Sequence, residues 1–284
     1  MFSFLSGLTN LQQRIIAGLS GMAIVINAIY WSEWSYFLLF FGICLLANLE
    51  FYDLLIADKK KPNKLFGTVI GMCIYTLFFL VARKTPGISS KAYLILFPLC
   101  AFIFIYELYY KNKKKPFNNV AYTILGILYV SIPFSVMHVS SFVFGYYSWQ
   151  ICLGSLLLLW ASDTGAYFSG KTMGRTKLFL RVSPGKTWEG TLGGGLLSIL
   201  VAIGLSYFFT ELTLFQWLCM SVIIVIAGTY GDLVESSFKR SLEIKDSGAA
   251  IPGHGGFLDR FDGWLLASPF IAVFLELFRN IRLH

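Results

Sequence analysis

The chain alternates long apolar runs with short polar segments. Because an α-helix needs roughly 20 apolar residues to cross the hydrocarbon core of a bilayer, runs of this length predict membrane-spanning helices. Such runs occupy residues 14–30, 35–56, 65–82, 92–110, 118–137, 149–169, 189–209, 212–234 and 264–280. The pattern therefore predicts an all-α, polytopic integral membrane protein with about nine transmembrane helices.

The composition indicates the same class. Charged residues make up 13% of the chain, against about 25% in ordinary soluble proteins. All five cysteines fall inside apolar runs without metal-ligand spacing, so we expect them to be small packing residues. The net charge of +8 does not indicate a nucleic-acid partner, because the basic residues lie in short segments between spans.

The basic residues also predict a sidedness. With the N-terminus in the cytoplasm, 18 of the 23 Lys and Arg residues fall on inner segments and 5 on outer ones. Short positively charged loops favour the cytoplasmic side, so we expect an inside N-terminus, an outside C-terminus and a cytoplasmic segment over residues 235–262. Because the candidate chemistry is concentrated in the second half, we divide the chain into an N-terminal bundle, 1–148, and a catalytic half, 149–284.

Several carboxylates lie within or near the ends of these runs, where ionisable groups are costly and often functional. Glu50 and Asp53 share one helix face, and they either serve a function or pair with the lysines that follow. For Glu107 we favour a non-functional explanation, which is placement at the membrane interface or pairing with nearby lysines. Asp163 follows an apolar run and needs a cation, a metal or several hydrogen-bond donors.

The segment SPGKTWEG, residues 183–190, looks like the end of a phosphate-binding P-loop. The full motif needs a glycine at position 180, which is Leu, and a preceding strand of a soluble sheet. A Pro-Gly turn can still present Lys186 and backbone N–H groups to an anion.

The segment GDLVESSFKR, residues 231–240, ends the eighth run. Asp232, Glu235 and Lys239 are three and four residues apart, so they share one helix face. A solvated helix end with a Glu235–Lys239 pair is the alternative to a functional site.

The polar stretch SFKRSLEIKDSGAAIPGHGGFLDRFDG, residues 237–263, combines three kinds of residue. Hard oxygen ligands suited to Mg²⁺ are Asp246, Asp259 and Asp262. Glycines that free the backbone to curl around an anion are Gly253, Gly255 and Gly256. Side chains that can hold phosphate charge are Lys239, Arg240, His254 and Arg260. The mixture indicates a metal–polyphosphate site, and Asp259 is also placed to cap the next helix.

These residues resemble the signature of the CDP-diacylglycerol synthase, or phosphatidate cytidylyltransferase, family. In this chain the signature reads S-x-F-K-R, then K-D-x-G, then I-P-x-H-G-G-F-x-D-R-F-D, over residues 236–262. The upstream segments SDTGAYFSGKTMGRTKL and SPGKTWEG are similar to that family as well. The earlier spans match it only as apolar helices.

The resemblance implies a multi-pass enzyme of phospholipid biosynthesis that joins CTP and phosphatidate and releases pyrophosphate. It implies a divalent cation, usually Mg²⁺, a homodimer, and a site facing the cytoplasm from a bacterial inner membrane. Catalytic roles would fall to Asp232, Lys239, Asp246, His254, Asp259, Arg260 and Asp262, of which Asp232 and Asp259, then Asp262, are the expected metal ligands. Substrate binding would fall to Asp163, Lys186, Glu235, Arg240, Gly253, Gly255 and Gly256.

Elementary chemistry fits this reaction. A phosphate monoester has its second pKa near ~6, so the lipid phosphate is already a dianion at neutral pH and needs no general base. The barrier is repulsion between two anions, which cations lower by positioning and neutralisation.

Two other functions are consistent with parts of the pattern. A CTP-dependent lipid kinase would share related motifs but transfer the γ-phosphate. A transporter would place charges at mid-span in paired halves, whereas here they cluster at span ends in the second half.

Overall fold

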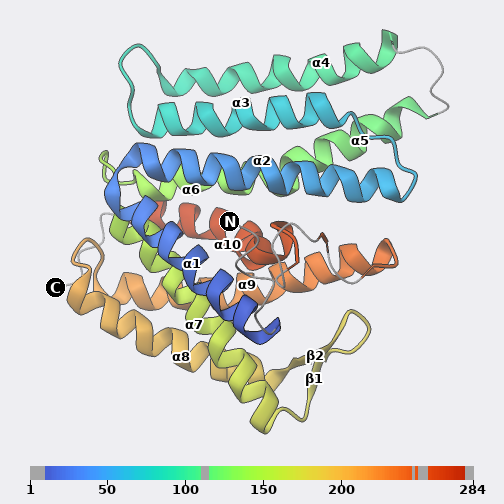
Figure 1. Cartoon of the computed structure of the whole chain (residues 1–284). Coiled ribbons are helices and arrows are strands. Elements are labelled where there is room, and N and C mark those ends of the chain that lie inside the picture. Colours follow the sequence, from blue (N-terminus) through green and yellow to red (C-terminus); the bar gives the residue numbers. More distant parts are fainter. Residues whose placement is uncertain (1–9, 110–114, 245–246, 249–254, 279–284) are drawn as a thin grey trace.

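The computed structural model describes residues 10–109, 115–244, 247–248 and 255–278, and this part of the chain is a bundle of long helices (Figure 1). The first half contains α1 Asn10–Trp31, α2 Glu33–Ala57, α3 Lys64–Ala82, the 3-10 helix η2 Ser90–Ile95, α4 Leu96–Tyr109, α5 Pro116–Gly126, the π-helical turn η3 Ile127–Ser131 and α6 Ile132–Ser141. The second half contains α7 Trp149–Met173, β1 Lys177–Phe179, β2 Ser183–Thr187, α8 Trp188–Phe208, α9 Leu214–Ser241 and α10 Leu258–Phe278. The all-α, polytopic class is confirmed.

Each predicted span coincides with helix in the described part of the chain, where eight helical segments are long and apolar enough to cross a membrane. The fifth of the predicted spans is the continuous segment α5–η3–α6. The first predicted span is α1, which contributes only a shorter apolar stretch, Gly18–Trp31.

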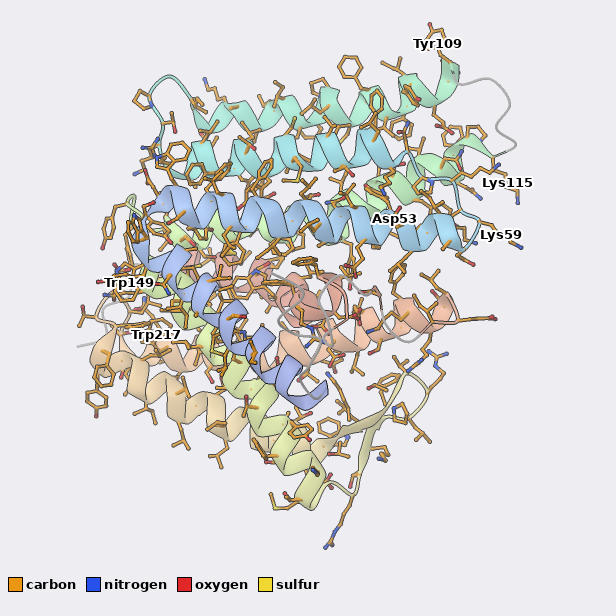
Figure 2. The ribbon with its side chains drawn as sticks, viewed as in Figure 1. Asp53, Lys59, Tyr109, Lys115, Trp149 and Trp217 are labelled. Atoms are coloured by element: carbon orange, nitrogen blue, oxygen red, sulfur yellow. The ribbon has the colours of Figure 1, made fainter. Side chains whose placement is uncertain are left out.

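Labelled side chains mark the two ends of the bundle. Figure 2 shows Asp53, Lys59 and Lys115 at one end, and Trp149 and Trp217 at the other. The β1–β2 hairpin and the C-terminal end of α9 lie at the same end as Lys59 and Lys115 (Figure 1). The basic segments that we assigned to one side of the membrane therefore share that side with the predicted chemistry.

The antiparallel β1–β2 hairpin was not expected from the apolar pattern, because its strands are short and polar. Glu189, in the first turn of α8, accepts hydrogen bonds from the backbone N–H groups of Arg175 and Thr176, at 3.1 Å each. Thr187 caps α8 by accepting a hydrogen bond from the N–H of Gly190 at 3.1 Å. These contacts fix the hairpin against the end of α7.

Close helix crossings in the second half depend on glycine. A Cβ at Gly165 of α7 would lie 2.8 Å from the carbonyl oxygen of Gly193 in α8. A Cβ at Gly231 of α9 would lie 2.5 Å from the carbonyl oxygen of Asp262 and 3.0 Å from the Cα of Gly263 in α10. Small residues allow such approaches between membrane helices, and the second crossing sets how near α9 and α10 bring their side chains.

The two halves share one buried core. Phe51 of α2 stacks on Phe238 of α9, with ring centroids 5.0 Å apart. Phe134 of α6 packs against Phe261 of α10, at 5.5 Å. The buried core is continuous across residue 148. The division of the chain at that residue therefore stays a prediction, and it concerns where the catalytic residues lie.

The α9–α10 crossing generates the first prediction. Gly231→Ala should destabilise the protein by about 1–3 kcal/mol, because the added methyl group overlaps the backbone of α10. Thermal unfolding in detergent measures the effect. Gly204→Ala in α8 is the control, since a Cβ there meets nothing within 4 Å. Equal stability of the two variants would contradict the close crossing.

Candidate active site

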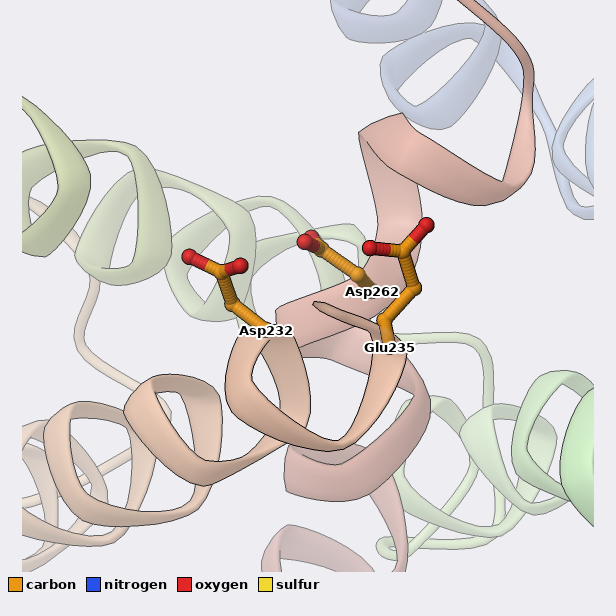
Figure 3. Close-up of side chains that lie close together, drawn as sticks. All are labelled: Asp232, Glu235 and Asp262. Atoms are coloured by element: carbon orange, nitrogen blue, oxygen red, sulfur yellow. The ribbon is translucent and has the colours of Figure 1, made fainter. Parts of the chain in front are cut away.

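Three carboxylates meet at the α9–α10 crossing. Asp232 and Glu235 lie on one face of α9, and Asp262 comes from the beginning of α10. Their ligand oxygens all lie within 4.8 Å of one another, and Figure 3 shows the three side chains extending into one space. The three-residue spacing on α9 and the glycine contact at Gly231 together produce this cluster.

The cluster has the chemistry of a divalent cation site. Glu235 is fully buried, and its Oε1 has no hydrogen-bond partner among the described residues. Its ion-pair partner is Lys239, whose Nζ lies 2.6 Å from Oε2. Oxygen ligands of this kind suit Mg²⁺, and a cation would offset the cost of burying like charges together. Asp232, Glu235 and Asp262 therefore fit a bound divalent ion.

Lys186 approaches the cluster from the hairpin. Its ammonium forms an ion pair with Asp232 and lies 3.4 Å from the carbonyl oxygen of Thr229. Asp232 also accepts a hydrogen bond from Ser236 at 3.3 Å. Lys186 lies within strand β2 and not in a Pro-Gly turn, so that part of the prediction was wrong, but the structure does bring Lys186 together with the predicted face of α9.

A cavity of about 510 Å³ adjoins this ion pair between α7, β2, α8 and α9. Its lining includes Asp163, Lys171, Lys186 and Asp232. The predicted Asp163 therefore lies in the same wall as Lys186. The lysines of this lining can bind an anionic group of a ligand. The carboxylates can bind a metal ion or the ligand's hydrogen-bond donors.

Asp259 adjoins the carboxylate cluster through Glu235 and Lys239, although it is not one of the three residues whose oxygens lie within 4.8 Å of one another. It accepts a hydrogen bond from Lys239 at 2.7 Å, and from the backbone N–H groups of Ser247 at 3.1 Å and Gly256 at 3.0 Å. Because Lys239 also pairs with Glu235, it links Asp259 to the cluster. Helix α10 begins at Leu258, six residues before the predicted span, so Asp259 lies in its first turn.

The glycines of the predicted anion loop surround protein carboxylates in this structure. Gly255 has φ +82°, and a Cβ there would lie 2.7 Å from Oδ2 of Asp259. A Cβ at Gly256 would lie 1.7 Å from Oε1 of Glu50. Any side chain at either position would therefore displace an acidic group that the loop encloses.

Glu50 is a site residue that the sequence left open. It accepts a hydrogen bond from the N–H of Phe257 at 2.8 Å and another from the hydroxyl of Ser247. Its neighbour Asp53 instead forms an ion pair with Lys64 at 2.6 Å. Asp53 therefore pairs with one of the lysines that follow it, whereas Glu50 contacts the loop before α10.

The other predicted site residues are exposed at the surface or lie outside the described part of the chain. Arg240 is exposed, and it donates a hydrogen bond to the carbonyl oxygen of Ile244 at 3.2 Å. Arg260 is exposed in the first turn of α10. Glu107 is buried and accepts a hydrogen bond from Asn119 at 2.6 Å. The residues outside the described ranges are Asp246, Gly253 and His254.

Comparison with known proteins found a family model and several named relatives that match this chain. A family model described as the cytidylyltransferase family matches residues 12–278. A phosphatidate cytidylyltransferase of Bacillus subtilis is 30% identical over 280 residues, which cover 95% of this chain and 100% of that protein. Proteins of the same name from Staphylococcus haemolyticus and Staphylococcus epidermidis are 39% and 40% identical over 172 residues.

In both staphylococcal comparisons, the aligned part covers 60% of this chain and 64% of the relative, so it spans less than two thirds of those proteins. The family model, by contrast, covers nearly the whole chain, including the cluster, the hairpin and the glycine loop. The chain belongs to the cytidylyltransferase family.

Proposed function

We propose that the chain is a phosphatidate cytidylyltransferase, which converts CTP and phosphatidate into CDP-diacylglycerol and pyrophosphate in phospholipid biosynthesis. The observation that carries the proposal is the buried carboxylate cluster beside Lys186 and a polar cavity, in a membrane protein. The name and full coverage of the Bacillus subtilis relative support this substrate pair.

In the proposed reaction, an oxygen of the lipid phosphate attacks the α-phosphorus of CTP. A bond forms between them, and the bond from the α-phosphorus to the bridging oxygen of the β-phosphate breaks, which releases pyrophosphate. The attacking phosphate is a dianion at neutral pH, so no side chain has to remove a proton.

We propose that Asp232, Glu235 and Asp262 hold Mg²⁺ as a cofactor. When bound, Mg²⁺ would neutralise triphosphate charge and help to position the α-phosphorus. Asp259 is also expected to be a ligand from the family resemblance, and its carboxylate accepts hydrogen bonds from Lys239, Ser247 and Gly256. Its contacts instead support a role in holding Lys239 next to Glu235.

Lys186 is proposed to bind a phosphate of CTP. Its ammonium lies between Asp232 and the cavity wall that also contains Asp163. A triphosphate entering this cavity would meet one fixed cation at the edge of the acidic cluster. Charged hydrogen bonds of this kind orient phosphates and offset their repulsion toward an incoming anion.

We also propose that the protein acts in a bacterial inner membrane, with this site facing the cytoplasm and with two chains forming a homodimer. The charge asymmetry of the sequence supports the orientation. A site at the ends of spans lets acyl chains stay in the lipid bilayer while CTP arrives from water. The homodimer rests on the family resemblance.

Labelled CTP tests the reaction directly. Purified protein with phosphatidate and Mg²⁺ should transfer label from the α-position of CTP to lipid, and should leave γ-label in pyrophosphate. Thin-layer chromatography of the lipid and aqueous products measures both. Transfer of γ-label to lipid would instead identify a lipid kinase.

Variants of the cluster test the metal ligands. Asp232→Asn, Glu235→Gln and Asp262→Asn should each lower kcat by about 100-fold or more, because each removes a negative ligand from one site. Pairs of these changes should cost little more than one, since they act through the same ion. Asp58→Asn, at an exposed ion pair with Lys60, is the control.

Comparing variants of Asp259 and Glu235 decides which of these two residues is a metal ligand beside Asp232 and Asp262. If Asp259→Asn raises the Mg²⁺ concentration needed for half-maximal rate while Glu235→Gln leaves it unchanged, the proposed set is wrong. Steady-state rates across a Mg²⁺ titration measure this difference.

Lys186→Ala tests the CTP contact. Loss of one charged hydrogen bond should lower kcat/KM for CTP by about 10- to 100-fold. Lys177→Ala, at an exposed position of the same hairpin, should change it by less than about twofold, as expected for a surface charge. Equal CTP kinetics in the two variants would remove Lys186 from the site.

A further inference from the structure

Glu50 connects α2 to the loop between α9 and α10. Its Oε2 accepts a hydrogen bond from the N–H of Phe257 at 2.8 Å, and its Oε1 accepts one from the hydroxyl of Ser247. These partners lie 207 and 197 residues farther along the chain. One carboxylate of the first half therefore binds both described parts of the loop.

The fit between this carboxylate and the loop is close. A Cβ at Gly256 would lie 1.7 Å from Oε1 of Glu50, and one at Gly248 would lie 3.3 Å from its Cδ. The next residue of α2, Phe51, stacks on Phe238 of α9. The two glycines let the loop pack closely against α2, and the stacked rings of Phe51 and Phe238 hold α2 against α9.

The same loop positions also hold Asp259. Ser247 donates its hydroxyl to Glu50 and its N–H to Asp259. The adjacent N–H groups of Gly256 and Phe257 divide between the two carboxylates in the same way. Asp259 then binds Lys239, so a continuous set of contacts runs from Glu50 to the acidic cluster.

We propose that Glu50 is a positioning residue for the reaction: through the loop and Asp259, it fixes Lys239 beside the acidic cluster. The N-terminal bundle is then part of the active site and not only a membrane anchor. The effect on catalysis rests on the proposed function, whereas the effect on the loop does not. In this proposal Glu50 positions the loop through its hydrogen bonds to Ser247 and Phe257, and its negative charge is not required.

Hydrogen–deuterium exchange tests the loop contact without any assay of activity. In Glu50→Ala, peptides that cover residues 255–258 should exchange faster than in the wild type, because the N–H of Phe257 loses its acceptor. Asp53→Ala, which lies three residues away and pairs with Lys64, should leave these peptides unchanged. Unchanged exchange in Glu50→Ala would overturn the proposal.

Kinetics test the consequence for the site. Glu50→Ala should lower kcat by about 10- to 100-fold, the loss expected for hydrogen bonds to a charged group, with KM for CTP changed by less than about threefold. Glu50→Gln should recover most of kcat, because its amide oxygen can accept from Phe257 while its NH₂ donates to Ser247. Asp53→Ala should match the wild type.

The outcomes separate the possible roles. Glu50→Gln as impaired as Glu50→Ala would overturn positioning by hydrogen bonds, as would a kcat loss of equal size in Asp53→Ala. The thermal unfolding midpoint of Glu50→Gln is the control for folding. A midpoint near that of the wild type shows that the kinetic comparison is made on folded protein. If the wild type transfers no label from CTP, the proposed function fails, and the exchange experiment alone then supports or overturns the loop contact.

Discussion

Three carboxylates within 4.8 Å of one another, one of them fully buried, are the constraint on which the rest of this site depends. Like charges this close repel strongly where water is scarce. The chain can hold them together only because α9 and α10 touch backbone to backbone at Gly231 and Gly263. The repulsion is offset at two points by protein cations, and the remaining charge suits a divalent ion.

The two lysines have different places in this arrangement. Lys239 lies largely buried between Glu235 and Asp259, where it is bonded on both sides. Lys186 meets Asp232 at the edge of a cavity that both residues line. Lys239 therefore stabilises the acidic cluster, and Lys186 is placed to contact a ligand in the cavity.

The sequence predicted the spans well because apolar length is a local property that a bilayer selects. It placed the start of α10 six residues late, since LDRFD is polar although it is helical. It placed Asp232, Glu235 and Lys186 near one site, but it could not show that Asp262, more than Asp259, completes the cluster, because that depends on the angle at which two helices cross. The hydrogen-bond partners of Glu50 could not be predicted from the sequence either, since they lie about 200 residues away along the chain.

The most direct measurement is the position of a bound metal ion. Crystals of the protein grown with Mn²⁺ and CTP would show the ion by anomalous scattering. The account predicts a peak in contact with the carboxylates of Asp232, Glu235 and Asp262, while Asp259 stays bonded to Lys239. A peak bound by Asp259 and Asp232, away from Glu235, would contradict it.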